Sequence, residues 1–322
     1  MLLYIYILLV SHWYNFIKKF HYWLISLKNF LPQCLNYRYR DSMSEARVIS
    51  FHKYICDEKV IDQFLCSLDD EWKRIAEKSI INIKTIAYNN FIPYQSLYDD
   101  RLVADQKKFA TYVLSNHGKY FKNFDYLYLT NDYYLSTLDS VFTDLWWKAI
   151  LDCWAFIGDT AIPFANKYIN STIHAFEPEN SNYQKLIENI EYNHLQTQIL
   201  PVKLWVGDQN ITTTISDGWA GAKIGEWDQT IEITTIDSYA EKQNLNVWMI
   251  KRDIEWFEYE SILGAQKTIQ KDRPVLIISL YHRGKDFFEI IEMLKSWGLW
   301  YKFTVRKWNC FHPFADTVLI AY

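Results

Sequence analysis

Short apolar runs alternate with amphipathic stretches from about residue 125 to the end of the chain. The runs are typical of buried strands and cover residues 149–151, 173–176, 247–250, 275–280 and 317–322. Between them, apolar residues recur at helical spacing around residues 183–190, 258–269 and 287–294. Strands that alternate with helices predict a doubly wound α/β fold with a mostly parallel sheet. Ser181 and Gln184 have the spacing of a capping box at the start of one of these helices.

The first 124 residues have a different pattern. Helical spacing over residues 44–118 predicts a mainly helical N-terminal region, residues 43–124, in front of a domain over residues 125–322. Residues 1–42 are aromatic and basic, and their apolar opening is too short to span a bilayer. Two interpretations stay open. Residues 1–30 form an amphipathic helix in contact with a membrane surface, or translation starts at Met43 and residues 1–42 are not made.

Composition narrows the function classes. The formal net charge is −4 and the isoelectric point is near 6.1, which argues against a nucleic-acid binder that relies on bulk electrostatics. The five cysteines are scattered without a CxxC pair, which excludes a disulfide scaffold and a zinc ribbon and fits a reducing compartment. We therefore expect a cytoplasmic protein.

Acidic residues stand where the first two strands of the predicted sheet end. The first strand runs into Asp152-Cys153-Trp154-Ala155-Phe156-Ile157-Gly158-Asp159, and the second ends at Glu177. An acid at the second position can accept hydrogen bonds from the two hydroxyls of a ribose, which indicates a nucleoside-containing cofactor. A nicotinamide dinucleotide would need a G-x-G-x-x-G loop, and acids repel its pyrophosphate. Asp152 and Asp159 instead suit the amino and sulfonium groups of S-adenosylmethionine.

The second half of the chain carries a more specific pattern. Thr235-Ile236-Asp237 precedes Ile250-Lys251-Arg252-Asp253-Ile254-Glu255-Trp256-Phe257-Glu258 and then Ile262-Leu263-Gly264-Ala265. Together with the D-x-G-x-x-x-G-like loop and the Glu177-Pro178 pair, this resembles the FkbM family of S-adenosylmethionine-dependent methyltransferases. The resemblance covers residues 125–322. It implies a class I, Rossmann-like fold of seven strands with the last antiparallel, and O-methylation of saccharides or similar acceptors.

Tryptophan replaces glycine at two positions of these motifs, Trp154 and Trp256. The whole chain has 9 glycines and 14 tryptophans, and Trp205, Trp219, Trp227 and Trp300 also fall where a turn or a close approach favours glycine. Two explanations stay open. The protein is an inactive methyltransferase-fold binding module whose cofactor pocket is blocked by Trp154, or UGA codons that mean glycine have been translated as tryptophan.

Roles for single residues follow from their places at the strand ends. For the cofactor we expect Gly158 to allow the close turn, Glu177 to bind the ribose and Asp152 to orient the loop or meet the amino group. Asp152 or Asp159 could instead cap the next helix. Asp208, after the predicted third strand, is a candidate for the adenine or a simple turn acid.

Catalysis of methyl transfer to a hydroxyl needs a base and accurate positioning. We favour Asp253 as the base or as the group that orients the acceptor, with Glu255 supporting the loop. His282 is an alternative base or a structural histidine, and Lys251 is expected to support the fold. The spacing of acids, cysteines and histidines indicates no metal site. The sequence indicates neither the acceptor nor the oligomeric state.

Overall fold

The computed structural model describes residues 50–81 with gaps, 148–215, 229–307 except residue 255, and 317–322. Several sequence-based expectations concern residues outside this set. These residues are 1–42, most of 43–124, Glu255, Trp219 and Trp227. None of the described helices is long and apolar enough to cross a membrane.

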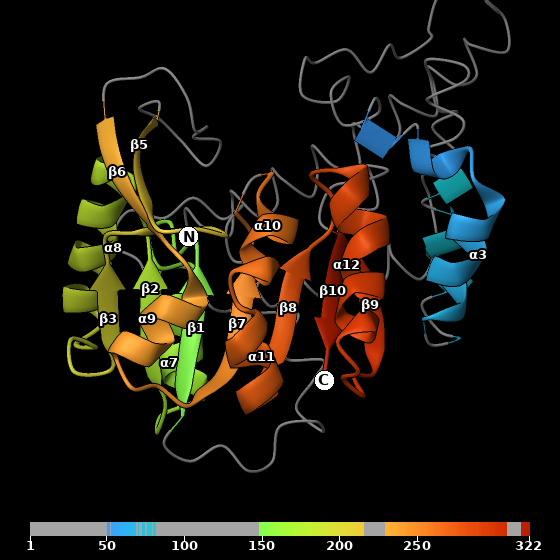
Figure 1. Ribbon diagram of the computed structural model, residues 1–322. Helices are drawn as coiled ribbons and strands as arrows, with labels where there is room; N and C mark the ends of the chain where they lie inside the picture. The colour runs from blue at the N-terminus through green and yellow to red at the C-terminus, as the bar shows by residue number, and fades with distance from the viewer. Residues whose placement is uncertain are drawn as a thin grey trace, which may run out of the picture.

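A sheet of seven strands forms the centre of the molecule (Figure 1). Its order is β3-β2-β1-β7-β8-β10-β9, and β10 pairs antiparallel with both of its neighbours while the other described pairs are parallel. The strands are β1 (Ala149–Cys153), β2 (Thr172–Phe176), β3 (Ile199–Val202), β7 (Val247–Arg252), β8 (Val275–Ser279), β9 (Phe303–Lys307) and β10 (Thr317–Ala321). The predicted class I methyltransferase architecture, with an antiparallel last strand, is confirmed.

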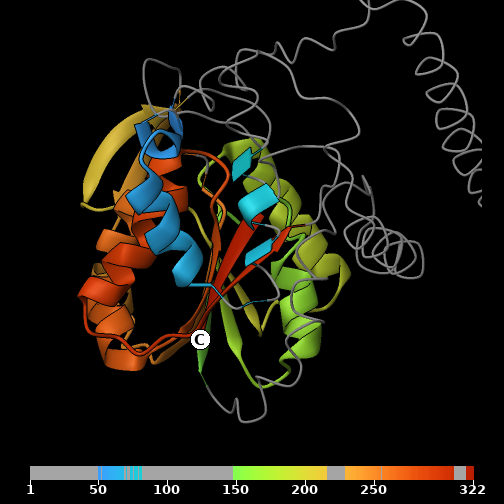
Figure 2. The ribbon, with the colours of Figure 1, turned by 90° about the vertical axis from the view of Figure 1, so that its right-hand side faces the viewer.

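Helices cover both faces of the sheet, so that the domain has three layers (Figure 2). One face carries α7 (Ala161–Lys167) and α8 (Asn180–Tyr192). The other carries α9 (Ile236–Lys242), α10 (Glu258–Leu263), α11 (Gln266–Asp272) and α12 (Gly284–Ser296). Each face has its own apolar core, and neighbouring strand residues serve different cores: Ile150 packs with α7 and α8, Leu151 with the opposite layer. Burial on both sides explains the uninterrupted apolar runs of the central strands.

A second, smaller sheet of order β4-β6-β5 follows β3. It consists of β4 (Trp205–Val206), β5 (Ile211–Ile215) and β6 (Gln229–Thr234). The prediction that Asp208 follows the third strand of the main sheet is therefore wrong. That strand ends at Val202, and the exposed Asp208 comes after β4. The sequence of β5, Ile-Thr-Thr-Thr-Ile, consists of β-branched residues that favour a strand, but it lacks the apolar run that marks the buried strands.

The N-terminal region packs on helix α12. Helix α3 (Glu58–Cys66) presents Phe64 to Phe287, with ring centroids 4.7 Å apart, and Phe51 joins the same cluster. The backbone comes so close that a Cβ on Gly284 would stand 2.4 Å from the carbonyl oxygen of Ser50. The described part of this region thus packs against the sheet domain. The domain boundaries at 42 and 124 stay predictions.

Helix ends differ from the sequence-based expectations in three places. Glu179, rather than Ser181, caps α8, and its side chain accepts hydrogen bonds from the backbone N–H groups of Ser181 and Asn182. The cap position of α7 is Thr160, so neither Asp152 nor Asp159 caps that helix. The predicted helix over 258–269 is broken at Gly264, where a Cβ would lie 2.1 Å from the carbonyl oxygen of Gly207.

Candidate functional site

The loop that follows β1 is held against the end of β2. The backbone N–H groups of Trp154 and Ala155 both donate to the carbonyl oxygen of Phe176, at 3.1 and 2.7 Å. Gly158 has a φ of 94°, a conformation that side chains rarely adopt, and its N–H donates to the Ala155 carbonyl at 2.7 Å. Gly158 thus lies in a close turn, and its role beneath the cofactor stays a prediction.

Glu177 is buried at the end of β2 and braces two loops. Its Oε2 accepts the N–H of Phe156 and its Oε1 the N–H of Glu179, both at 3.0 Å. Burial raises the pKa of this carboxyl to about 8. Each carboxylate oxygen has two acceptor sites, so these bonds leave capacity for hydroxyl donors. The role of Glu177 as ribose ligand stays a prediction.

Asp152 and Asp159 gather around one buried cation. Lys251 is the parallel neighbour of Asp152 on β7, and its Nζ lies 3.1 Å from Asp152 Oδ1 and donates to the Trp154 carbonyl at 2.8 Å. Burial raises the pKa of Asp159 to about 7, and it also raises that of Asp152, although Lys251 opposes it. Burial would lower the pKa of Lys251, but Asp152, Asp159 and Asp253 together raise it. The loop thus presents more carboxylates than positive charges, which suits a ligand that brings a cation.

Two tryptophans of this region have glycine-like backbone conformations. Trp154 has a φ of 79° and Trp256 a φ of 77°, between those of Gly298 at 69° and Gly158 at 94°. The other described non-glycine residues with positive φ lie at 47–57°, inside or beside the ordinary left-handed helical region; they are Phe156, His194, Asn244 and Arg273. The two motif tryptophans therefore fit the explanation that their positions are built for glycine.

The side-chain environments of the tryptophans do not follow the same division. The buried indole N–H of Trp256 has no hydrogen-bond partner among the described residues, and the same holds for Trp205. A buried indole N–H normally has one. Trp154 packs edge-on against Trp205, with ring centroids 4.9 Å apart. Trp205 itself lies in a strand, and neither it nor Trp300 has a positive φ, so the backbone does not require glycine at these two positions.

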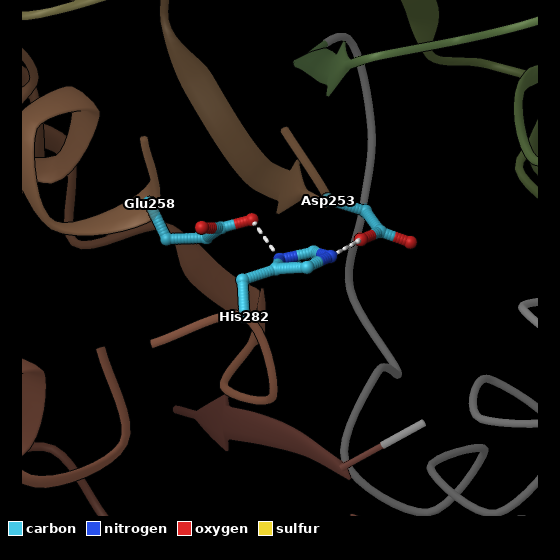
Figure 3. Close-up of side chains that lie close together, drawn as sticks. All are labelled: Asp253, Glu258 and His282. Carbon is cyan, nitrogen blue, oxygen red and sulfur yellow. Dashed lines mark hydrogen bonds and ion pairs between the residues drawn. The ribbon is translucent and has the colours of Figure 1, made fainter. Parts of the chain in front are cut away.

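The second cluster lies where β7 and β8 end, and it joins Asp253, Glu258 and His282 (Figure 3). His282 stands between two carboxylates: its Nδ1 is 2.7 Å from Glu258 Oε1, and its Nε2 is 3.8 Å from Asp253 Oδ1. Tyr281 donates its hydroxyl to Asp253 Oδ1 at 3.0 Å. The structure thus brings together the two residues that the sequence proposed as alternative bases, Asp253 and His282.

Glu258 is the residue of this cluster for which sequence reasoning gave no role. It belongs to the motif that also contains Asp253, but its partner His282 lies 24 residues further along the chain. The only signal in the sequence is that both stand just beyond neighbouring strands, which places them at one edge of a parallel sheet. Ligand atoms of Asp253, Glu258 and His282 lie within 4.8 Å of one another, a grouping that the sequence spacing did not indicate.

The predicted site residues therefore form two neighbouring groups. Asp152, Trp154, Gly158, Asp159 and Glu177 surround the loop after β1, and Asp253 and His282 follow at the ends of the next strands. Asp208 lies against the junction of α10 and α11: a Cβ on Gly264 would stand 3.1 Å from its Cα. Glu255 is outside the described residues.

Comparisons with known proteins give one match to a family model and several to solved structures. Residues 152–299 match the family model described as a methyltransferase FkbM domain. Among solved structures, the methyltransferase FkbM from Methylobacillus flagellatus KT is similar, with a TM-score of 0.56 and 17% sequence identity. That match covers 84% of this chain and 60% of the other, so the chain corresponds to less than two thirds of that protein's length. The methyltransferase domain of METTL16 matches with a TM-score of 0.44 and 12% identity, over 68% of this chain and 79% of that one.

A search of curated proteins finds no match. The fold, the position of the acidic loop and the family match over residues 152–299 nevertheless agree with one another. Over residues 152–299, the chain is therefore similar to the FkbM methyltransferase domain.

Proposed function

We propose that this protein is an S-adenosylmethionine-dependent O-methyltransferase that acts on a hydroxyl of a saccharide or a similar metabolite. The observation that carries the proposal is Glu177, a buried carboxylate that braces the loop after β1 from the end of β2. In an open parallel sheet, the ends of these two strands are where a ligand binds.

The residues present fit such a cofactor in charge and in hydrogen-bonding capacity. Glu177 would bind the ribose hydroxyls, while Asp152 and Asp159 would face the positively charged end. When bound, S-adenosylmethionine supplies an electrophilic methyl group whose bond to sulfur breaks with its electron pair left on sulfur.

The acceptor would be held at the second cluster. Asp253 has a side chain that is 25% exposed, whereas His282 behind it is fully buried. A hydroxyl group that approaches from solvent would therefore meet Asp253 first, and a carboxylate oxygen is a good acceptor for it. A partly exposed carboxylate that accepts a hydrogen bond from a hydroxyl suits a polyhydroxylated acceptor.

A second function is favoured by one observation, the indole at position 154. If tryptophan is the true residue there, the loop that should take the cofactor carries a bulky side chain at a glycine-like φ. The protein would then be a non-catalytic binding module with the same fold.

Binding of S-adenosylmethionine to three full-length variants separates these functions. We expect Trp154→Gly to bind the cofactor, and Trp154→Gly/Glu177→Ala to bind it at least about 10-fold more weakly, since a hydrogen bond to a charged group contributes about 1.5–3 kcal/mol. The matched control is Trp154→Gly/Glu188→Ala, because Glu188 is exposed on α8. Equal affinity of all three variants would refute the ribose assignment, and no binding by any would favour the binding module.

A further inference from the structure

We propose that Glu258 and His282 form the general-base pair of this site: His282 Nε2 takes the proton of the acceptor hydroxyl, and Glu258 is the positioning residue that holds the other proton on Nδ1. This inference rests on the proposed methyltransferase function and deepens it. It gives the two candidate bases of the sequence different tasks, with Asp253 orienting the acceptor.

Glu258 is placed so that it can only act through His282. It is the first residue of α10 and is fully buried. Its Oε1 accepts the N–H of Ile254 at 3.0 Å and lies 2.7 Å from His282 Nδ1. The bond to Ile254 fixes the carboxylate to the same loop that carries Asp253. An acceptor-only group at this distance requires the proton of the neutral imidazole on Nδ1, which leaves Nε2 as the basic nitrogen.

The charge of Glu258 supports the same assignment. Burial alone would raise the pKa of this carboxyl, but the neighbouring His282 lowers it below its ordinary value. The other charges packed around the pair come from α10 and α12, and they largely compensate one another. Arg283 Nη2 contacts Glu260 at 2.5 Å and Asp286 at 2.7 Å. Glu258 is therefore the carboxylate that directly faces His282 from the buried side, and it would stabilise an imidazolium.

Nε2 is buried and points toward Asp253, the partly exposed member of the cluster (Figure 3). It lies 3.8 Å from Asp253 Oδ1, too far for a hydrogen bond and close enough for a hydroxyl oxygen to reach both atoms at about 2.8 Å. Asp253 Oδ1 is itself held by the Tyr281 hydroxyl at 3.0 Å. The acceptor is thereby oriented by Asp253 while its proton faces the imidazole.

The proton step balances within these residues. The acceptor O–H bond breaks, its proton moves to Nε2, and the electron pair left on oxygen forms the new bond to the methyl carbon. The imidazole becomes an imidazolium whose charge is paired with the Glu258 carboxylate, so no net charge is created in the buried site.

Nuclear magnetic resonance of the full chain, with ¹⁵N-labelled histidine, tests the pair without any cofactor. The His282 signals are those that disappear in His282→Gln. We expect Nδ1 to carry the proton in neutral His282. We also expect Glu258→Gln to lower the pKa of His282 by at least about one unit, which is a 10-fold change in acidity. Glu260→Gln is the matched control, because this glutamate of the same helix binds Arg283 and Lys285 instead; it should leave the His282 signals unchanged.

Kinetics in the Trp154→Gly background supply the second readout. Glu258→Gln should lower kcat by about 100-fold or more with little change in KM, and shift the acid limb of the kcat/KM profile in parallel with the His282 pKa. If neutral His282 in the unsubstituted protein carries its proton on Nε2 instead of Nδ1, the proposed general-base pair is refuted, even if Glu258→Gln does not fold. A His282 pKa that Glu258→Gln leaves unchanged would refute it as well.

Two further outcomes separate this inference from its alternatives. Activity that is lost with a chelator and restored by Mg²⁺ or Mn²⁺ would make Nε2 and Asp253 metal ligands and overturn the base role. Failure of Trp154→Gly to bind S-adenosylmethionine would overturn the methyltransferase proposal and the base role with it. In that case, the effect of Glu258→Gln on the His282 signals would still show whether these two residues form a pair.

Discussion

The loops after β1 and after β7 have the same backbone peculiarity and opposite electrostatics. Both follow buried strands that pair with each other, and each has a tryptophan at a φ near 78°: Trp154 at 79° and Trp256 at 77°. In the first loop, burial raises the pKa of Asp152 and Asp159, and the single cation Lys251 serves both. Beside the second loop, the Glu258 carboxylate lies 2.7 Å from the imidazole Nδ1 of His282, so that its partner is a neutral hydrogen-bond donor.

The difference shows how one sheet edge can hold two kinds of site. A surplus of buried carboxylates is costly until a cationic ligand arrives, which favours binding there. A carboxylate that is hydrogen-bonded to a neutral imidazole needs no ligand for its stability and leaves the second imidazole nitrogen able to take a proton. The following predictions test this contrast, from the largest expected effect to the smallest.

Replacing Trp154 should have the largest effect, because it bears on whether the first loop can bind at all. We expect Trp154→Gly to bind S-adenosylmethionine at least about 100-fold more tightly than the chain with tryptophan, since the loop conformation is one that glycine adopts freely. Isothermal titration calorimetry measures the difference. Trp300→Gly is the control, because that indole is 97% exposed.

Reading the codon at position 154 and the mass of the corresponding peptide in native protein decides between the two explanations of the tryptophans. A UGA codon with a glycine mass is expected. A UGG codon with a tryptophan mass would contradict the glycine explanation. Equal cofactor affinity of Trp154→Gly and of the chain with tryptophan would show that the indole does not block the cofactor.

Removing the single cation of the first loop should destabilise the fold strongly. Lys251→Met leaves Asp152 buried without its ion pair, which costs about 3–5 kcal/mol of the free energy of unfolding. Urea denaturation followed by circular dichroism measures the loss, and Asp152→Asn in the same chain should recover part of it. Lys271→Met, at a lysine whose side chain is 71% exposed, should change the free energy of unfolding by less than about 0.5 kcal/mol.

Two tryptophans of the β7 region should respond differently to glycine. Trp248 is buried in β7 against Tyr168, so Trp248→Gly should lower the free energy of unfolding by about 3 kcal/mol or more. Trp256→Gly loses side-chain packing. It also relieves a left-handed backbone that costs roughly 1–2 kcal/mol and removes a buried N–H without a partner. The net change in the free energy of unfolding should therefore stay within about 1 kcal/mol. Similar losses for both variants would show that position 256 is not built for glycine.

Raising the pH should weaken the ligand-free fold through Glu177. Its pKa is about 8 in the folded protein against 4.5 for the ordinary carboxyl, so the folded state binds more protons between these values. Its stabilising contribution is fully present below pH 4.5 and is lost as the pH rises to about 8, with a slope of up to about 1.4 kcal/mol per pH unit. Urea midpoints at three pH values measure the slope, which Glu177→Gln should flatten. An unaltered slope in that variant, with Glu188→Gln as control, would assign the effect to other groups.

Sequence reasoning reached the central fold because burial on both sheet faces leaves a direct pattern. The apolar runs at 149–151 and 275–280 correspond to β1 and β8, which are buried throughout. It failed where structure depends on contacts distant in sequence. The break between α10 and α11 requires the close approach of Gly264 to Gly207. The β-branched residues of β5 favour a strand, but its pairing with β6 leaves no pattern in the sequence.

The candidate site was predictable to a similar extent. Strand ends located Asp152, Glu177, Asp253 and His282, since the topology of a parallel sheet places them at one edge. Glu258 could not be assigned, because its role depends on a side-chain direction and on an imidazole that comes from the next strand. The positive φ at Trp154 and Trp256 agrees with the resemblance, which implies glycine at both motif positions.

The position of β10 has a consequence for how the chain folds. This strand is made after β9 but is inserted between β8 and β9, pairing with both. Until it arrives, β8 presents an apolar edge with unpaired backbone groups, the kind of edge that promotes association between chains. A chain cut before residue 317 should therefore aggregate during synthesis rather than persist as a smaller, soluble domain.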